Sequence, residues 1–226
     1  MAAPARARPP RWHRRPGDRP REILDGALSA FGRHGFRRAT LAEVARHAGV
    51  CPGTVSHYFG SKAELFEALI ADRFGGFVAQ EEALAASYRG PMRTLLHQLL
   101  RRIWDHAWSP GILDLMQVVQ VEAAEFPHSG RLLCRQLSER WRRLMGRILE
   151  AGVRSGEFRP LPTDVAARVI GYTLLGVAQK VSAFGRYEPR MPDRETMWQG
   201  VLQMIDRYVQ ADPPAAGGRP PRRTAR

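Results

Sequence analysis

The stretch that decides the fold is Thr40–Lys62, TLAEVARHAGVCPGTVSHYFGSK. Ala45 stands where two short helices crossing at a steep angle would touch, since a larger side chain there would push them apart. Gly49 falls at the turn between them, where a positive φ has no steric cost for glycine. Pro52 suits the first turn of the second helix, because an amide there would lack an intrahelical partner anyway. The shared core would contain Val44, Ala48, Val50, Val55 and Tyr58. The spacing predicts a helix-turn-helix.

The second helix of this pair carries an unusual set of outward side chains. An ordinary helical hairpin inside a larger core would carry bulk on both helices. Here the outward positions hold small or hydrogen-bonding groups that can approach a base edge or a phosphate. These positions are Gly53, Thr54, Ser56 and His57. The pattern favours DNA binding over a buried hairpin.

A longer segment, Gly35–Leu69, carries a family resemblance. It reads GFRRATLAEVARHAGVCPGTVSHYFGSKAELFEAL and resembles the N-terminal domain of the tetracycline-repressor (TetR) family. Upstream, Ile23, Leu24, Ala27 and Phe31 are spaced for one face of a first helix that ends at Gly35. Two capping boxes, Thr40 with Glu43 and Ser61 with Glu64, mark the starts of the helices on either side of the recognition helix.

The resemblance implies that the recognition helix and the start of the next helix contact DNA. Lys62 and Lys180 are the only lysines among 35 basic residues, and the family uses the lysine corresponding to Lys62 on the DNA backbone. The family usually has serine where Cys51 stands and tyrosine where Ser56 stands, although the string VSHYF is similar to that of choline-responsive, BetI-like members. Tyr58 is either a phosphate donor through its hydroxyl, an apolar ring that closes the hairpin core, or both. The predicted DNA contacts are Thr40, Cys51, Pro52, Gly53, Thr54, Ser56, His57, Tyr58 and Lys62.

Charge and proline content outline the domains. The 226-residue chain has a net charge of +13, which implies a polyanionic partner or an anionic surface. Arginine and proline gather at both ends, so we expect disordered basic arms at 1–18 and 211–226. The first arm either contacts DNA or is a solubilising extension. Between the arms we expect an all-α protein with a DNA-binding domain at 19–77 and a helical effector-binding and dimerisation domain at 78–210.

Several other classes find no support in the residues. Two cysteines make no disulfide framework, and neither a membrane-spanning apolar run nor a secretory signal is apparent, so we expect a cytoplasmic, nucleoid-associated protein with no membrane partner. The resemblance implies a bacterial source. No HExxH, paired CxxC, GxSxG or glycine-rich phosphate loop is present, and His97 and His106 stand nine apart, so we expect no catalytic site, no metal and no cofactor. An architectural DNA-coating protein is the alternative, but it would not need some 130 residues of apolar helices.

The remainder of the chain predicts helices with clear breaks. One helix begins at Gly90-Pro91 and runs to about Trp108, before the interruption at 109–111, and Phe126-Pro127 closes the next. A long helix is expected from about Gly130 to before Gly156. Thr163 then caps a helix with a strongly apolar face, and a last helix carries Met197 to Tyr208.

The middle helices are where we expect a small-molecule effector, which the sequence does not identify beyond a largely apolar character. Trp104 and Trp108 lie one helical turn apart, and they form with neighbouring apolar residues either a ligand cavity or plain core. The predicted lining is Leu100, Trp104, Trp108, Leu115, Met116 and Val119, with polar groups from His106, Gln117 or Gln120.

Two copies of the chain are expected to act together on double-stranded DNA. One short recognition helix reads too few base pairs to be selective, so a homodimer on a palindromic operator is the usual solution. The resemblance implies that the last two helices form the dimer interface, here Val169, Ile170, Thr173, Val177, Val201 and Ile205. It also implies a repressor that a ligand releases by pivoting the fourth helix, Ser61 to about Phe74.

Overall fold

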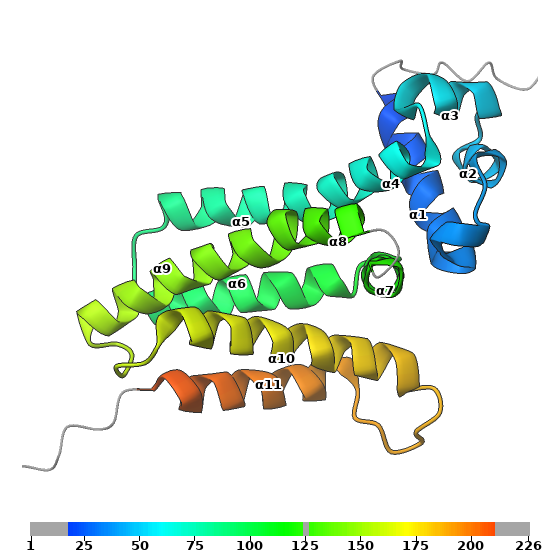
Figure 1. Ribbon diagram of the computed structural model, residues 1–226. Coiled ribbons are helices and arrows are strands. Elements are labelled where there is room, and N and C mark those ends of the chain that lie inside the picture. The colour runs from blue at the N-terminus through cyan, green and yellow to red at the C-terminus, as the bar shows by residue number, and fades with distance from the viewer. Residues whose placement is uncertain (1–17, 124–126, 211–226) are drawn as a thin grey trace, which may run out of the picture. The chain divides into compact units, whose positions relative to one another are not determined.

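The computed structural model describes residues 18–123 and 127–210 (Figure 1). All regular secondary structure in these ranges is helical, and an isolated bridge joins Phe158 to Gln210. The prediction of an all-α protein is therefore confirmed. The chain divides into two compact units between Leu69 and Ile70. The two expected basic arms lie outside the described residues, apart from Asp18.

The described part of the N-terminal unit contains four helices, the last of which ends one residue beyond the unit. They are α1 (Arg19–Arg38), α2 (Leu41–Ala48), α3 (Pro52–Phe59) and α4 (Lys62–Ile70). The expected end of the first helix at Gly35 appears as a break inside α1, where φ is 72°. Both predicted capping boxes are present, with Thr40 on Glu43 and Ser61 on Glu64.

The core of this unit rests on close backbone approach and on aromatic packing. A Cβ on Gly26 would lie 2.8 Å from the Val44 carbonyl oxygen and 2.8 Å from the Ala48 amide nitrogen, so glycine lets α1 lie directly on α2. Phe31 and Phe66 pack edge to face with ring centroids 5.1 Å apart. These contacts hold α2 against α1, so the outer side of α3 does not have to contribute to the core.

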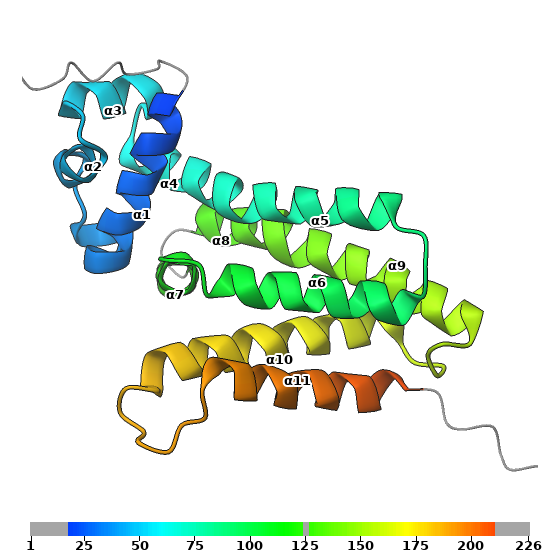
Figure 2. The same ribbon diagram turned by 180° about the vertical axis from the view of Figure 1, so that it is seen from behind.

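The C-terminal unit contains seven α-helices and two π-helical segments within the described ranges. They are η2 (Ala71–Gly75), α5 (Gly76–Ser87), α6 (Met92–Ala107), α7 (Ile112–Glu122), α8 (Pro127–Leu133), η3 (Cys134–Glu139), α9 (Arg140–Ser155), α10 (Thr163–Phe184) and α11 (Arg194–Val209). Both views show α5, α6, α9, α10 and α11 alongside one another, while α7 lies across them near the end of α6 (Figures 1 and 2). None of the described helices meets the length and apolarity needed to cross a membrane.

Two expected features of this unit need correction. The long helix predicted from about Gly130 begins at Pro127 and is interrupted by the π-helical turns of η3, which the spacing of apolar residues did not reveal. Thr163 is the first residue of α10 and does not cap it; Pro162 holds the cap position, and the Thr163 hydroxyl donates to Glu150 instead. The expected break at 109–111 is confirmed, since α6 ends at Ala107 and α7 begins at Ile112.

Candidate DNA-binding site and effector cavities

The α2–α3 pair has the geometry that the sequence predicts for a helix-turn-helix. Ala45 is 1% exposed, and its carbonyl oxygen accepts a 2.9 Å hydrogen bond from the Val50 amide across the turn. Gly49 ends α2 with φ of 64°, the left-handed conformation that glycine adopts without strain. Val44 and Val55 are fully buried between the helices. These contacts therefore hold α3 in a fixed position against α2.

The outer face of α3 is open. Cys51, Pro52, Gly53, Ser56 and His57 are exposed and Thr54 is half-buried. Tyr58 is 43% exposed and meets the His57 ring edge to face at 5.5 Å. Its ring therefore lies outside the hairpin core, which leaves the hydroxyl role as the open alternative. The face as a whole presents small groups, hydroxyls and one imidazole.

Lys62 is placed differently from an extended surface lysine. Its Nζ donates to the carbonyl oxygens of Phe36, Arg37 and Ala39 at 3.0, 3.1 and 3.1 Å and lies 4.8 Å from the centroid of the Phe36 ring. An ammonium has three N–H donors, so these three bonds use them all. The charge also sits at the C-terminal end of α1, where the helix dipole favours a cation. The geometry supports a structural role for Lys62, and its predicted phosphate contact remains a prediction.

Thr40 is likewise engaged within its own unit. Its hydroxyl accepts from the Glu43 amide at 3.2 Å, and its amide donates to the Glu43 carboxylate at 2.8 Å. These backbone and side-chain bonds from Thr40 lower the pKa of Glu43 below its usual value of 4.5. The cap fixes the start of α2, and a DNA contact by Thr40 stays a prediction.

The residues predicted to line an effector cavity pack in the core of the C-terminal unit. Five of them are buried, namely Leu100, Trp104, Leu115, Met116 and Val119. Trp108 is half-buried, with its ring centroid 5.9 Å from that of Trp104. Neither of the two cavities described next is lined by these six side chains. His106, proposed as a polar group, stacks on Phe77 at 4.1 Å, and its burial lowers its pKa.

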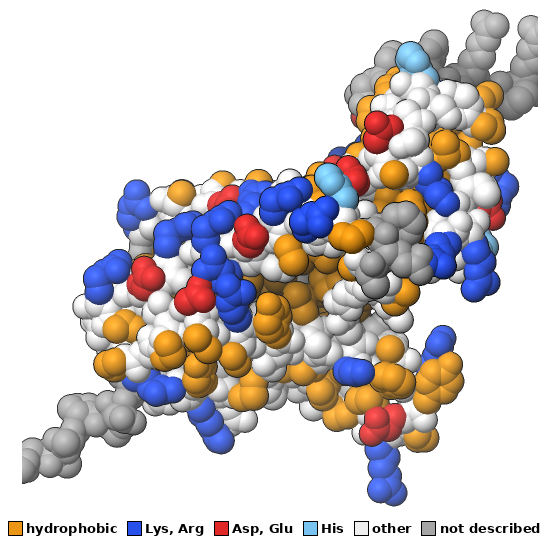
Figure 3. Space-filling view, in the orientation of Figure 1, with side chains coloured by type: hydrophobic (Ala, Val, Ile, Leu, Met, Phe, Trp, Pro, Cys, Tyr) orange, Lys and Arg blue, Asp and Glu red, His pale blue; other side chains and the backbone are white. Residues whose placement is uncertain are grey.

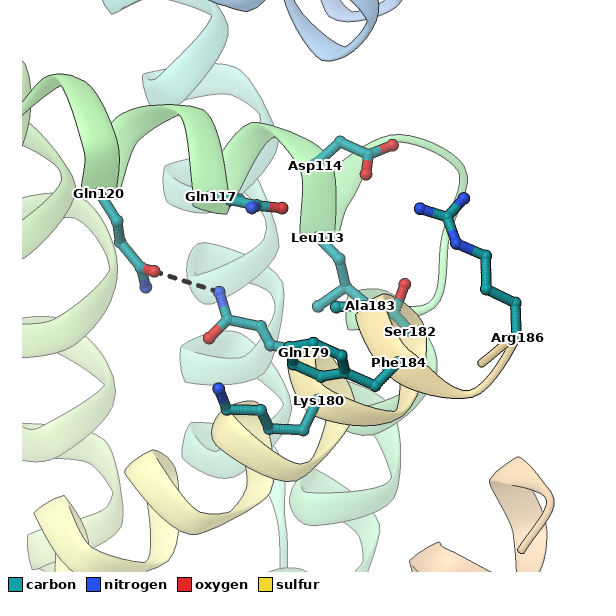
Figure 4. Close-up of a pocket in the computed structure, with 10 residues that line it drawn as sticks. All are labelled: Leu113, Asp114, Gln117, Gln120, Gln179, Lys180, Ser182, Ala183, Phe184 and Arg186. Carbon is teal, nitrogen blue, oxygen red and sulfur yellow. Dashed lines mark hydrogen bonds between the residues drawn. The ribbon is translucent and has the colours of Figure 1, made fainter. Parts of the chain in front are cut away.

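A polar groove of about 430 Å³ lies between α7 and the C-terminal end of α10 (Figure 4). Gln117 and Gln120 face it from α7, as the sequence suggested for an effector site, and the Gln179 amide donates to Gln120 across it at 3.4 Å. Lys180 and Arg186 extend along its open side (Figure 4). Because these polar groups are largely solvent-exposed, water can satisfy them without a ligand.

A second cavity lies between α6, the η3–α9 run and α10. It has a volume of about 30 Å³, and it opens on the face seen in Figure 3, where hydrophobic side chains surround a hollow between α9 and α10. Its walls are Ile103, Leu137, Ser138, Trp141, Arg142, Ala167, Arg168, Gly171, Tyr172 and Leu175. The Trp141 indole nitrogen and the Arg142 Nε are buried there without a hydrogen-bond partner among the described residues. No periodic signal in the sequence marks a buried donor without an acceptor.

The residues predicted for the dimer interface are divided between two sides of their helices. Ile170, Val201 and Ile205 are at most 6% exposed and pack inside the unit, whereas Val169 is 46% exposed. Thr173 and Val177 are half-buried. The other large exposed apolar side chains on α10 and α11 include Val165, Tyr172, Phe184 and Met204. The predicted set therefore mixes inward-facing and outward-facing positions, and the interface itself stays a prediction.

Within the described residues, no cluster of three His, Cys, Asp or Glu side chains could hold a metal ion. The rigid α2–α3 pair with its open second helix instead defines a helix-turn-helix DNA-binding protein. Comparison with known proteins agrees. Residues 23–69 match the family model of bacterial regulatory proteins of the tetR family, and residues 94–210 match the C-terminal domain of AefR-like transcriptional repressors. The chain belongs to the TetR family of transcriptional regulators.

Relatives and solved structures extend this assignment. The transcriptional regulator BetI of Agrobacterium fabrum is 30% identical over 153 residues, which are 67% of this chain and 69% of the relative. BetI of Escherichia coli is 44% identical over 54 residues, only 24% of this chain and 28% of that protein.

Two solved structures share the fold at 18% identity. A transcriptional regulator from Saccharomonospora viridis in complex with choline has a TM-score of 0.73, with 87% of this chain and 100% of that one covered. FadR of Bacillus subtilis in complex with stearoyl-CoA has a TM-score of 0.68, with 82% and 96% covered. At this sequence identity the similarity shows only that the fold is shared. The ligands bound in the two structures differ in charge and size.

Proposed function

We propose that this TetR-family regulator is a ligand-responsive repressor that binds a palindromic operator as a homodimer and is released by a largely apolar small molecule. On this proposal it acts in the cytoplasm, on the nucleoid, through regulation rather than catalysis. The observation that carries the proposal is the outer face of α3. Ser56 and His57 are exposed there on a helix whose other side is locked by Val55 and Ala45. Such a helix fits a major groove without rearrangement.

The dimer face proposed here is the outer side of α10 and α11. Val165, Val169 and Tyr172 follow the i, i+4, i+7 spacing of one helix face and are 52%, 46% and 63% exposed. Met204, 48% exposed, adds an apolar side chain from α11. An exposed apolar stripe of this kind favours protein contact over solvent. The residues Ile170, Val201 and Ile205 would support this face from beneath.

A route for ligand release is suggested by contacts inside the C-terminal unit. The Arg140 guanidinium, at the start of α9, donates to the Gly75 carbonyl of η2 at 3.0 Å and pairs with Glu82. η3, directly before Arg140, supplies part of the second cavity, and η2 begins directly after α4. π-helical segments often occur at functional sites. A ligand that moved η3 would therefore act on η2 and, through it, on the helix that follows the recognition helix.

The test is selection of bound sequences from a random DNA library by the purified full-length chain at near-physiological salt, which suppresses nonspecific binding through arginine. We expect a palindrome with two half-sites about one helical turn apart. The control is the Ser56→Ala, His57→Ala double variant, which should lose the enrichment while keeping its melting temperature. If the wild-type chain enriches no sequence, the basic arms would be the main DNA contact and the architectural alternative would replace the operator proposal.

A further inference from the structure

Two hydrogen-bond donors at the second cavity have no acceptor in the part of the chain that the structure describes. Trp141 is 5% exposed, and its indole Nε1–H has no acceptor. The Nε of Arg142, one residue further along α9, is buried beside the same cavity and also has no partner. A buried donor without an acceptor is destabilising, and native structures rarely keep one without a reason. Two such donors at one cavity point to a ligand with an acceptor group.

A glycine keeps the space beside the indole open. A Cβ on Gly171 would lie 3.3 Å from the Trp141 Nε1 atom and 3.4 Å from its Cδ1. Glycine in a helix interior is unfavourable relative to alanine, and Gly171 lies well inside the 22-residue helix α10. At this position the missing methyl group leaves room against the donor atom.

The side chains around the cavity carry a net positive charge. Arg142 and Arg168 both line it, and both pair with a single carboxylate, Asp164 at the start of α10. Hydrogen bonds from Arg142 and then Arg168 hold the pKa of Asp164 below its usual value, so it is ionised at neutral pH. Two cations and one anion leave one positive charge at the cavity. None of the described lining residues is acidic.

The remaining walls are apolar. Ile103, Leu137 and Leu175 come from three different segments, and Tyr172 stands at the exposed edge. The volume of about 30 Å³ is well below the several hundred Å³ of a pocket that encloses a whole small molecule. To bind there, the apolar part of a ligand would have to separate η3 and α9 from α10. A ligand that releases the operator must bind such a changed conformation more tightly than the original one.

From these observations we infer that the effector is an apolar molecule with an anionic, carboxylate-type head, held by Trp141 and Arg142 beside Gly171. This inference rests on the proposed function and names the ligand class of its site. It separates this chain from regulators whose ligand is a quaternary ammonium ion, because a cation would face Arg142 and Arg168 and would leave both donors unsatisfied.

The experiment uses three probes with the same ten-carbon chain and different heads: decanoate, decanol and decyltrimethylammonium. Binding to the full-length protein is measured by isothermal titration calorimetry at monomeric probe concentrations. Release from the selected operator is followed in parallel by fluorescence anisotropy. We expect decanoate to bind at least about tenfold more tightly than either other probe, because a hydrogen bond to a charged group is stronger than one to a neutral group. Decanoate should also release the operator at the lowest concentration.

Two matched pairs of variants locate the effect. Gly171→Ala places a methyl group against the Trp141 donor and should abolish decanoate binding, whereas Gly146→Ala on α9, where a Cβ meets nothing within 4 Å, should leave it unchanged. Trp141→Phe keeps a ring but removes the donor and should weaken decanoate about tenfold or more. Trp198→Phe, a buried tryptophan outside the cavity, should not. Melting temperatures and sedimentation verify that each variant is folded and in the wild-type oligomeric state.

The outcomes separate the inference from the proposed function. Tighter binding of decyltrimethylammonium, equal binding of all three probes, or unchanged decanoate binding in Gly171→Ala would overturn the inference and leave the operator proposal standing. The absence of binding by any probe to a protein that still selects its operator would overturn it as well. Failure of operator selection with intact decanoate binding would instead count against the proposed function alone.

Discussion

The two units of this protein differ in whether their polar side chains have hydrogen-bond partners. In the described part of the N-terminal unit, polar side chains close local networks: Thr40 with Glu43, Ser61 with Glu64, and Lys62 with three carbonyl oxygens. In the described ranges of the C-terminal unit, the indole nitrogens of Trp104, Trp108 and Trp141 and the Nε of Arg142 are buried without hydrogen-bond partners. A unit with its polar groups satisfied favours one conformation, whereas unsatisfied donors favour whatever ligand or rearrangement supplies acceptors. We therefore expect the DNA-reading unit to keep one conformation and the effector unit to change its conformation when a ligand binds.

The largest effect should come from a substitution that leaves the DNA-reading unit untouched. Val169→Asp puts a charge on the proposed dimer face, and separating two linked half-site contacts costs the avidity of the pair, about 100-fold or more in operator affinity. Sedimentation equilibrium and operator titration measure the two effects together. Val121→Asp, on an apolar residue of α7 that is 69% exposed, is the control and should alter neither. A Val169→Asp protein that stayed dimeric would move the interface elsewhere.

The next effect tests how far the effector unit depends on an ion pair whose carboxylate is buried. Glu81 is fully buried, whereas Arg102 is 47% exposed, and the Arg102 Nε–H is shared between the two carboxylate oxygens at 2.9 and 2.7 Å. Arg102→Ala would leave that carboxylate buried alone, which we expect to lower the free energy of unfolding by about 3 kcal/mol. Urea unfolding followed by tryptophan fluorescence measures it.

The control for this pair is Arg143→Ala, since Arg143 makes only a 3.9 Å exposed contact with Glu139. That substitution should change stability by no more than about 0.5 kcal/mol. Similar losses from the two substitutions would show that burial of Glu81 does not set the strength of its pair.

Lys62 offers the sharpest comparison of a structural with a DNA-contacting role. Lys62→Met keeps the apolar stem and removes all three donors, so we expect the N-terminal unit to lose about 1–3 kcal/mol of stability. The dependence of operator affinity on salt should stay the same. If the ammonium instead neutralised a phosphate, the slope of log K against log salt would fall by about 0.9 for each subunit of the dimer, with little change in stability. Lys180→Met, on an exposed lysine of α10, is the matched control.

Features that depend on neighbouring residues could be predicted from the sequence, whereas contacts between distant residues could not. Gly49, Pro52 and the Thr40–Glu43 cap are local devices whose consequences lie within a few residues, so the helix-turn-helix could be placed correctly. The partners of Lys62 lie 23 to 26 residues away, and no local rule identifies them. The cavity depends on Gly171 meeting Trp141 from another helix, which only the packed structure reveals. The predicted interface, which the family resemblance implies, likewise did not separate Ile170, which is buried, from Val169, which is exposed.

The smallest effect concerns the charge in the N-terminal caps. Hydrogen bonds from Thr40 lower the pKa of Glu43 in the folded state relative to its usual value of 4.5. A group with a lowered folded pKa stabilises the fold above its unfolded pKa and loses that contribution as the pH falls through the folded pKa. Stability of the N-terminal unit should therefore decline as the pH drops below about 4.5.

Glu43→Gln keeps a side chain that can accept from the Thr40 amide but cannot ionise. Thermal melts from about pH 6 to pH 3 should show a slightly lower melting temperature than wild type at the upper end and a shallower acid decline below it. Glu188→Gln, on an exposed acid of the α10–α11 loop, should leave the profile of the N-terminal unit unchanged. An unaltered acid decline in Glu43→Gln would mean that the cap acts through its geometry alone. The single conformation of the DNA-reading unit would then depend on Gly49, Gly26 and Lys62 rather than on the charge of Glu43.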